Sequence, residues 1–142
     1  MRDTHQVFPA LGLLATFGLA THMVVQLAAQ TRPDLKNAGT AEVRNGRDEV
    51  VLRGNFEAPT TQEGEIQRTA TLRSTGVDAD ASGIAEIELS GKGATPTEVE
   101  FEVRRVDPGA AFSFVVDGAV LGTATADRRG EVEFEMDIGG GQ

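Results

Sequence analysis

Cysteine, tryptophan and tyrosine are absent from this sequence of 142 residues, and histidine occurs only twice. The lack of cysteine excludes disulfide bonds, thiolate metal sites and a cysteine nucleophile. The two histidines, His5 and His22, both lie near the N-terminus, so the rest of the chain cannot supply the histidine of a Ser-His-Asp arrangement. We therefore expect a protein without enzymatic activity.

Basic residues are also scarce, because 13 Lys and Arg stand against 22 Asp and Glu, which gives a formal net charge of −9. Nucleic-acid binding needs clusters of Lys and Arg that contact phosphates. The charge balance therefore predicts that nucleic acid is not a partner.

One segment, residues 7–29 (VFPALGLLATFGLATHMVVQLAA), has no formal charge. As a helix it would be about 34 Å long, enough to cross a hydrocarbon layer of about 30 Å. The alternative is a cleaved secretory signal, which normally has a shorter apolar core and a small-x-small cleavage site. Cleavage after Ala29 would place Leu27 at the −3 position, so the sequence favours a retained transmembrane anchor over residues 1–30.

Small and polar residues share one stripe of this predicted helix: Ala15, Gly18, His22, Gln26 and Ala29. Polar side chains inside a membrane usually face a partner. The favoured interpretation is that the stripe packs against a neighbouring helix, with His22 and Gln26 as hydrogen-bonding groups. The alternative is that neutral His22 ligates the metal of a flat macrocycle and Gly18 leaves room for the ring.

Residues 5–27 (HQVFPALGLLATFGLATHMVVQL) resemble the α-type light-harvesting antenna polypeptides of purple-type photosynthetic bacteria. Those chains have a short N-terminal arm with Phe and Pro, one span, and a small-x-x-x-His pair. The resemblance implies a bacteriochlorophyll ligated by His22, with Gly18 at the small position. Antenna chains are short, so the resemblance implies an accessory single-span subunit of a reaction centre and antenna complex, in contact with other membrane helices and with lipid.

Residues 31–48 mix Pro, Gly, Asn and charged residues without apolar periodicity, and we interpret them as a linker. The domain proper is then residues 49–142. An acidic, cysteine-free β domain behind a very short N-terminal tail is expected on the periplasmic side of the cell inner membrane, with the N-terminus in the cytoplasm.

From Glu49 onward, apolar and polar residues alternate with period two, which is typical of strands with one buried face. Asp117-Gly118 is a strong signal for a tight hairpin, because such a turn needs positive φ at both central residues. The alternation predicts seven strands, at residues 49–55, 66–74, 84–90, 98–104, 112–116, 119–125 and 131–138. The predicted fold class is a single N-terminal transmembrane α-helix followed by an antiparallel immunoglobulin-like β-sandwich of about seven strands.

Two rows of glutamates, at 98, 100, 102 and at 131, 133, 135, have the spacing of single strand faces. We interpret them as solvated surface, because catalytic carboxylates need one member in an apolar pocket. Residues 78–83 (DADASG) resemble the opening of a calcium loop, but position 12 is Leu89 instead of glutamate, so an acidic turn is favoured and no metal site is expected.

Residues 80–89 and 127–136 share the pattern D-x-x-G-x-[AV]-E-[IF]-E-[LM]. We interpret this internal echo as two equivalent turn-and-strand units.

The sequence thus favours a non-enzymatic structural or assembly subunit of a larger membrane complex, for which the antenna resemblance implies a photosynthetic reaction centre. The alternative is a stand-alone membrane-anchored binding module for a surface polymer or a protein ligand.

Overall fold

The computed structural model of the chain describes residues 33–91 and 95–138, which form an all-β domain. A single 3-10 turn, η2 (Leu35–Asn37), precedes the first strand. The strands are β1 (Thr40–Arg44), β2 (Val50–Asn55), β3 (Thr60–Gln62), β4 (Glu65–Ser74), β5 (Ser82–Leu89), β6 (Pro96–Arg104), β7 (Ala111–Val116), β8 (Ala119–Thr125) and β9 (Val132–Asp137).

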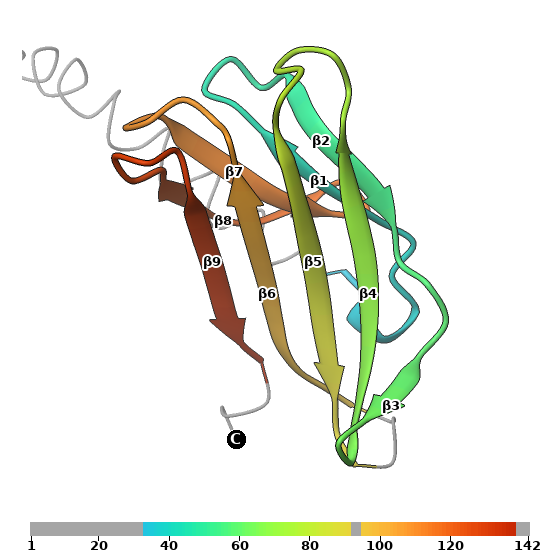
Figure 1. Cartoon of the computed structure of the whole chain (residues 1–142). Helices are drawn as coiled ribbons and strands as arrows, with labels where there is room; N and C mark the ends of the chain where they lie inside the picture. The colour runs from blue at the N-terminus through green and yellow to red at the C-terminus, as the bar shows by residue number, and fades with distance from the viewer. Residues whose placement is uncertain (1–32, 92–94, 139–142) are drawn as a thin grey trace, which may run out of the picture. The chain divides into compact units, whose positions relative to one another are not determined.

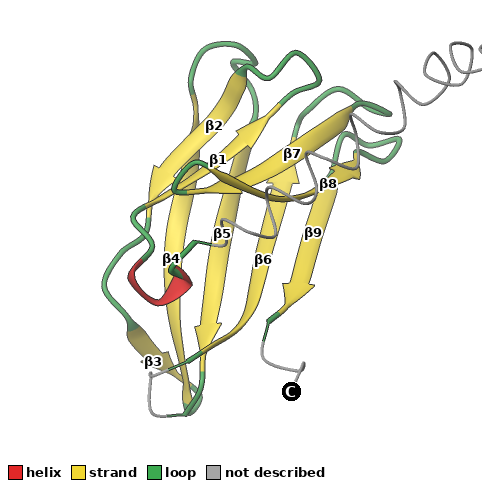
Figure 2. Ribbon diagram, turned by 180° about the vertical axis from the view of Figure 1, so that it is seen from behind, coloured by secondary structure: helices red, strands yellow, loops and turns green. Residues whose placement is uncertain are grey.

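The nine strands form one hydrogen-bonded sheet with the order β8-β7-β1-β2-β4-β5-β6-β9, and β3 pairs with β4 beside this path. Every pairing is antiparallel. The sheet bends back on itself, so β1, β2, β7 and β8 cross over β4, β5, β6 and β9 at an angle (Figures 1 and 2). The first and last strands of the order, β8 and β9, thereby come into contact without pairing.

Three phenylalanines hold the bent sheet together from inside. The Phe114 ring of β7 stacks on Phe134 of β9 with centroids 5.0 Å apart and also lies 5.1 Å from Phe101 of β6. Aromatic pairs at such distances contribute about 0.5–1.5 kcal/mol beyond their buried area. Gly122 of β8 allows the closure, because a Cβ there would lie 2.4 Å from the Phe134 ring.

The interior is apolar throughout the described residues, with no buried polar or charged side chain. Alternate residues of β5 and β6 fill it, which is the period-two pattern of strands with one wet face. The alternation predicted for residues 84–90 and 98–104 is therefore confirmed.

The predicted fold class is wrong. The described residues form nine strands in one continuous sheet, in place of about seven strands in the two sheets of an immunoglobulin-like sandwich. Pairing between β2 and β4 joins what a sandwich would keep as separate layers. Alternation identifies strands, but sheet order depends on pairings between residues far apart in the chain.

The predicted linker contains a central strand. β1 lies within residues 31–48, pairs with β2 on one side and with β7 on the other, and buries Ala41 and Val43. The β domain consequently begins at Pro33 instead of Glu49.

The transmembrane part of the predicted fold class also lacks support. Residues 33–91 and 95–138 include no helix that is long and apolar enough to cross a membrane. The segment predicted as the anchor, residues 1–30, lies outside the described residues.

The hairpin between β7 and β8 is confirmed. Asp117 and Gly118 both have positive φ, 48° and 84°. The Asp117 carboxylate also accepts hydrogen bonds from the backbone N–H groups of Gly39 and Thr40, with N···O distances of 3.0 and 2.8 Å. The turn thereby fixes the start of β1.

Candidate functional site: an acidic sheet face

The outer face of β5, β6 and β9 carries carboxylates at almost every position. Pairing aligns three rows across these strands: Ile84, Glu102 and Glu133; Glu86, Glu100 and Glu135; and Glu88, Glu98 and Asp137. Eight of these nine side chains are acidic, and we call the eight the acidic face. With strands about 4.8 Å apart and same-face residues about 6.8 Å apart, the rows span about 10 Å by 14 Å.

The register brings like charges directly opposite one another. The Ile138 N–H donates to the Thr97 carbonyl at 2.9 Å, so the neighbouring Glu98 and Asp137 form a non-hydrogen-bonded pair. Side chains of such pairs are closer together than those of hydrogen-bonded pairs. The same alternation places Glu100 opposite Glu135 in a pair of this kind. Like charges in these positions destabilise a sheet.

This crowding changes the proton affinity of three glutamates. Partial burial, followed by the charges of Glu102 and Glu88, raises the pKa of Glu86 above its ordinary value. Burial and the surrounding carboxylates likewise raise the pKa of Glu98 and of Glu100. All three pKa values are raised. In a catalytic acid and base pair, by contrast, the environments push the two pKa values apart.

Arginine partners occur elsewhere in the domain. Glu42 of β1 forms ion pairs with Arg44 and Arg53, at 2.8 and 2.9 Å, and Glu49 pairs with Arg47 at 3.0 Å. Among the described residues, no lysine or arginine lies within ion-pair distance of the acidic face. The fold thus concentrates uncompensated negative charge on one side of the sheet.

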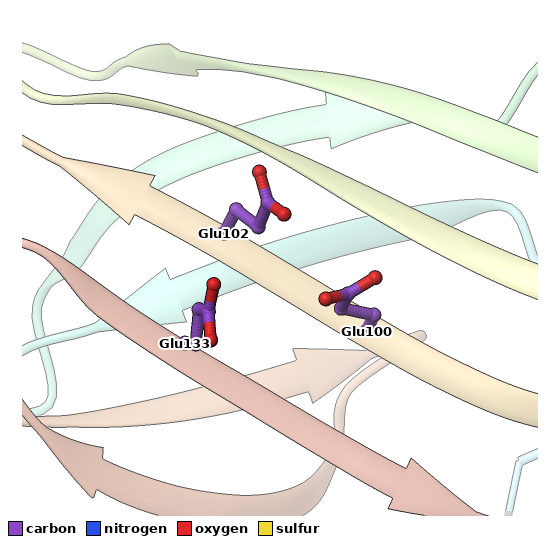
Figure 3. A group of neighbouring side chains, drawn as sticks. All are labelled: Glu100, Glu102 and Glu133. Atoms are coloured by element: carbon purple, nitrogen blue, oxygen red, sulfur yellow. The ribbon is translucent and has the colours of Figure 1, made fainter.

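Figure 3 shows the closest group of carboxylates, Glu100 and Glu102 from β6 and Glu133 from β9. One carboxylate oxygen from each of these residues lies within 4.8 Å of the other two. Among the described residues, this is the group of side chains whose spacing could hold a metal ion. Hard cations prefer such oxygens, but Ca²⁺ takes six to eight of them. Protein atoms from these three residues would supply only part of that shell.

The residues predicted as helix-packing or pigment-binding, Ala15, Gly18, His22, Gln26 and Ala29, all lie outside the described residues. The antenna resemblance and the bacteriochlorophyll at His22 therefore stay predictions.

The calcium-like segment has a different structure from a calcium loop. Ser82 and Gly83 already belong to β5, and the Asp78 carbonyl accepts hydrogen bonds from the Ser74 hydroxyl and the Ala81 N–H. The acidic-turn interpretation agrees with this geometry.

The glutamates predicted to lie on a solvated strand face do so at 98, 100 and 102 of β6 and at 133 and 135 of β9, whereas Glu131 precedes β9. Sequence reasoning did not connect Glu86 and Glu88 with them. The internal echo could have indicated this connection, because its two copies place glutamates at 86 and 88 and at 133 and 135. In the fold, the two echo strands, β5 and β9, flank β6 on opposite sides.

Comparison of the chain with family models, with curated proteins and with solved structures found no match. The interpretation of the acidic face therefore depends on its geometry.

Proposed function

We propose that the β domain is a non-enzymatic docking module of a larger assembly and that it binds a positively charged partner protein through the acidic face. The observation that carries this proposal is the alignment of eight carboxylates in three rows across β5, β6 and β9.

The energetic cost of the arrangement supports a binding role. Each like-charged pair directly opposite across the strands destabilises the sheet relative to neutral residues. Threonine or lysine at some of these outward positions would keep the alternation and remove the repulsion. A partner with lysines and arginines opposite the face would convert the repulsion into attraction, and would associate faster because of the long-range field.

The geometry favours a protein partner over a small substrate. The face is a broad strip of sheet, and its side chains range from half-buried on β5 and β6 to exposed on β9. A charged surface of this size could form part of a protein interface.

The test is zero-length cross-linking of carboxylates to amines in the full chain, purified together with its natural partners. The proposal predicts that Glu and Asp residues of the acidic face join to lysines of one partner. Cross-links confined to carboxylates elsewhere in the domain would contradict it.

A matched pair of variants makes the test quantitative. Combining Glu86→Gln, Glu100→Gln and Glu135→Gln neutralises the middle row of the face. The control removes the same charge at exposed sites elsewhere, with Glu57→Gln, Asp80→Asn and Asp107→Asn. We expect the first variant to weaken partner binding at least about tenfold in low salt, and the control to change it less than about threefold.

A further inference from the structure

The outer edge of β9 is a regular strand edge that pairs with no other strand among the described residues, although β8 contacts β9. β9 ends the sheet order, and its pairing with β6 has no register shift from Glu98 to Val103. It contains no proline. The other end strand, β8, is less regular, because its pairing with β7 shifts between Phe114 and Val115.

The backbone groups at this edge can be assigned. Because Ile138 donates its N–H to Thr97 of the β6 side, the even-numbered residues of β9 direct their backbone groups towards β6. The N–H and C=O groups of Glu133, Glu135 and Asp137 consequently point away from the sheet. They form a row of donors and acceptors with strand spacing.

Side chains on the two faces of β9 define what could pair there. Glu133, Glu135 and Asp137 project on the outer, acidic side and are exposed, whereas Phe134, Met136 and Ile138 project inward and are only half-buried. A strand added beside β9 would therefore meet carboxylates with its outward residues and apolar side chains with its inward residues.

We propose that an extended segment of a partner protein, with basic residues at alternate positions and apolar residues between them, adds to the sheet as a strand at the outer edge of β9. This inference rests on the proposed docking function and specifies the form of the partner. Main-chain hydrogen bonds would give affinity, and the alternating side chains would give specificity.

A second copy of this chain does not fit the same edge. Two β9 strands pairing with each other would place glutamates next to glutamates or aspartates, which repel. Charged edges commonly protect sheets against such self-association. The charge pattern therefore selects a basic segment over a second copy.

The test uses synthetic peptides with the full chain. The probe is a seven-residue peptide of alternating lysine and valine, and its controls are a block peptide of the same composition and a version with N-methyl groups on alternate backbone nitrogens. We expect the alternating peptide to bind at least about tenfold more tightly than either control, since only it can form the ladder with its charges on one side.

Two variants at one position separate backbone pairing from charge. Glu135→Gln removes a carboxylate, while Glu135→Pro also removes an N–H that points to the free edge and is not used by β6. We expect the proline variant to bind the alternating peptide about tenfold more weakly than the glutamine variant. A thermal melt checks that both variants fold, and the N-methylated peptide gives the same information if the proline variant does not.

The outcomes distinguish the two proposals. Equal binding of all three peptides, with loss on neutralising the middle row, would overturn strand addition and leave docking on the acidic face intact. If the three peptides bind equally and neutralising the middle row does not change their binding, both proposals are overturned. Self-association through β9, abolished by Glu135→Pro, would overturn the choice of a basic partner.

Discussion

At the scale of single residues, Arg68 has a structural role that the sequence alone does not indicate. Its guanidinium donates hydrogen bonds to the carbonyls of Ala38 and Glu57, at 2.7 and 2.9 Å, and more weakly to those of Lys36 and Phe56. Its Cζ also lies 5.7 Å from the centroid of the Phe56 ring. One side chain therefore connects the segment before β1 with the segment that follows β2.

Replacing Arg68 by methionine should destabilise the domain by about 1–3 kcal/mol, because carbonyls in a partly buried site lose their donor. Arg68→Lys should recover only part of this loss, since one ammonium cannot reproduce the planar fork. Arg73→Met, on the same strand but at an exposed position, is the matched control and should change stability by less than about 0.5 kcal/mol. Urea unfolding of the full chain measures all three, and equal effects at both sites would refute the assigned role.

At the scale of elements, the β7–β8 hairpin connects local turn chemistry with sheet order. Asp117 supplies positive φ to the turn and accepts hydrogen bonds from the start of β1, 77 residues earlier in the chain. The same residue therefore shapes one hairpin and docks it on a neighbouring strand.

The pair Asp117→Ala and Asp117→Asn separates these two roles. Alanine tolerates positive φ poorly and removes the acceptor, so we expect a loss of about 1–2 kcal/mol. Asparagine adopts this backbone conformation readily and keeps one oxygen, so its loss should be less than half as large. Thermal unfolding of the two variants compares them, and an asparagine variant as unstable as the alanine variant would contradict this division.

The strands were predictable to different degrees, for physical reasons. Alternation identified β6 and β9 because each has several inward apolar residues between outward glutamates. β1 was missed because only Ala41 and Val43 carry its pattern, between residues typical of loops. Sheet order was not predictable, because the pairing of β1 with β7 joins segments about 70 residues apart.

The candidate site was predictable only in part. Period-two spacing correctly placed Glu98, Glu100 and Glu102 on an outward face. Their alignment with Glu133, Glu135 and Asp137 depends on the register between β6 and β9, which the sequence of neither strand specifies by itself. A shift of one residue would have moved the whole set to the other side of the sheet.

At the scale of the whole molecule, the acidic face should determine how stability depends on pH. The pKa values of Glu86, Glu98 and Glu100 are raised in the folded state, so the folded protein binds more protons than the unfolded chain at pH values above the ordinary 4.5. Stability therefore falls as the pH rises from 4.5 through the raised pKa values.

Other carboxylates act in the opposite direction at lower pH. Hydrogen bonds from the backbone of Glu131 and Arg129 lower the pKa of Asp127 below 3.8. Burial opposes a similar shift at Glu42, but hydrogen bonds from Arg44 and Arg53 outweigh it and lower that pKa below 4.5. The stability that these groups contribute is present above their ordinary pKa values and is lost as the pH falls through the lowered ones.

We therefore predict a higher melting temperature at about pH 5 than at about pH 7, with a decline below about pH 4. Combining Glu86→Gln, Glu98→Gln and Glu100→Gln should raise the melting temperature at neutral pH and flatten the change between pH 5 and 7. The triple replacement at Glu57, Asp80 and Asp107 should leave that slope in place. Since salt screens exposed charges, about 0.5 M NaCl should stabilise the native chain more at pH 7 than at pH 5. If the neutralised face keeps the original slope, like-charge repulsion across β5, β6 and β9 is not its cause.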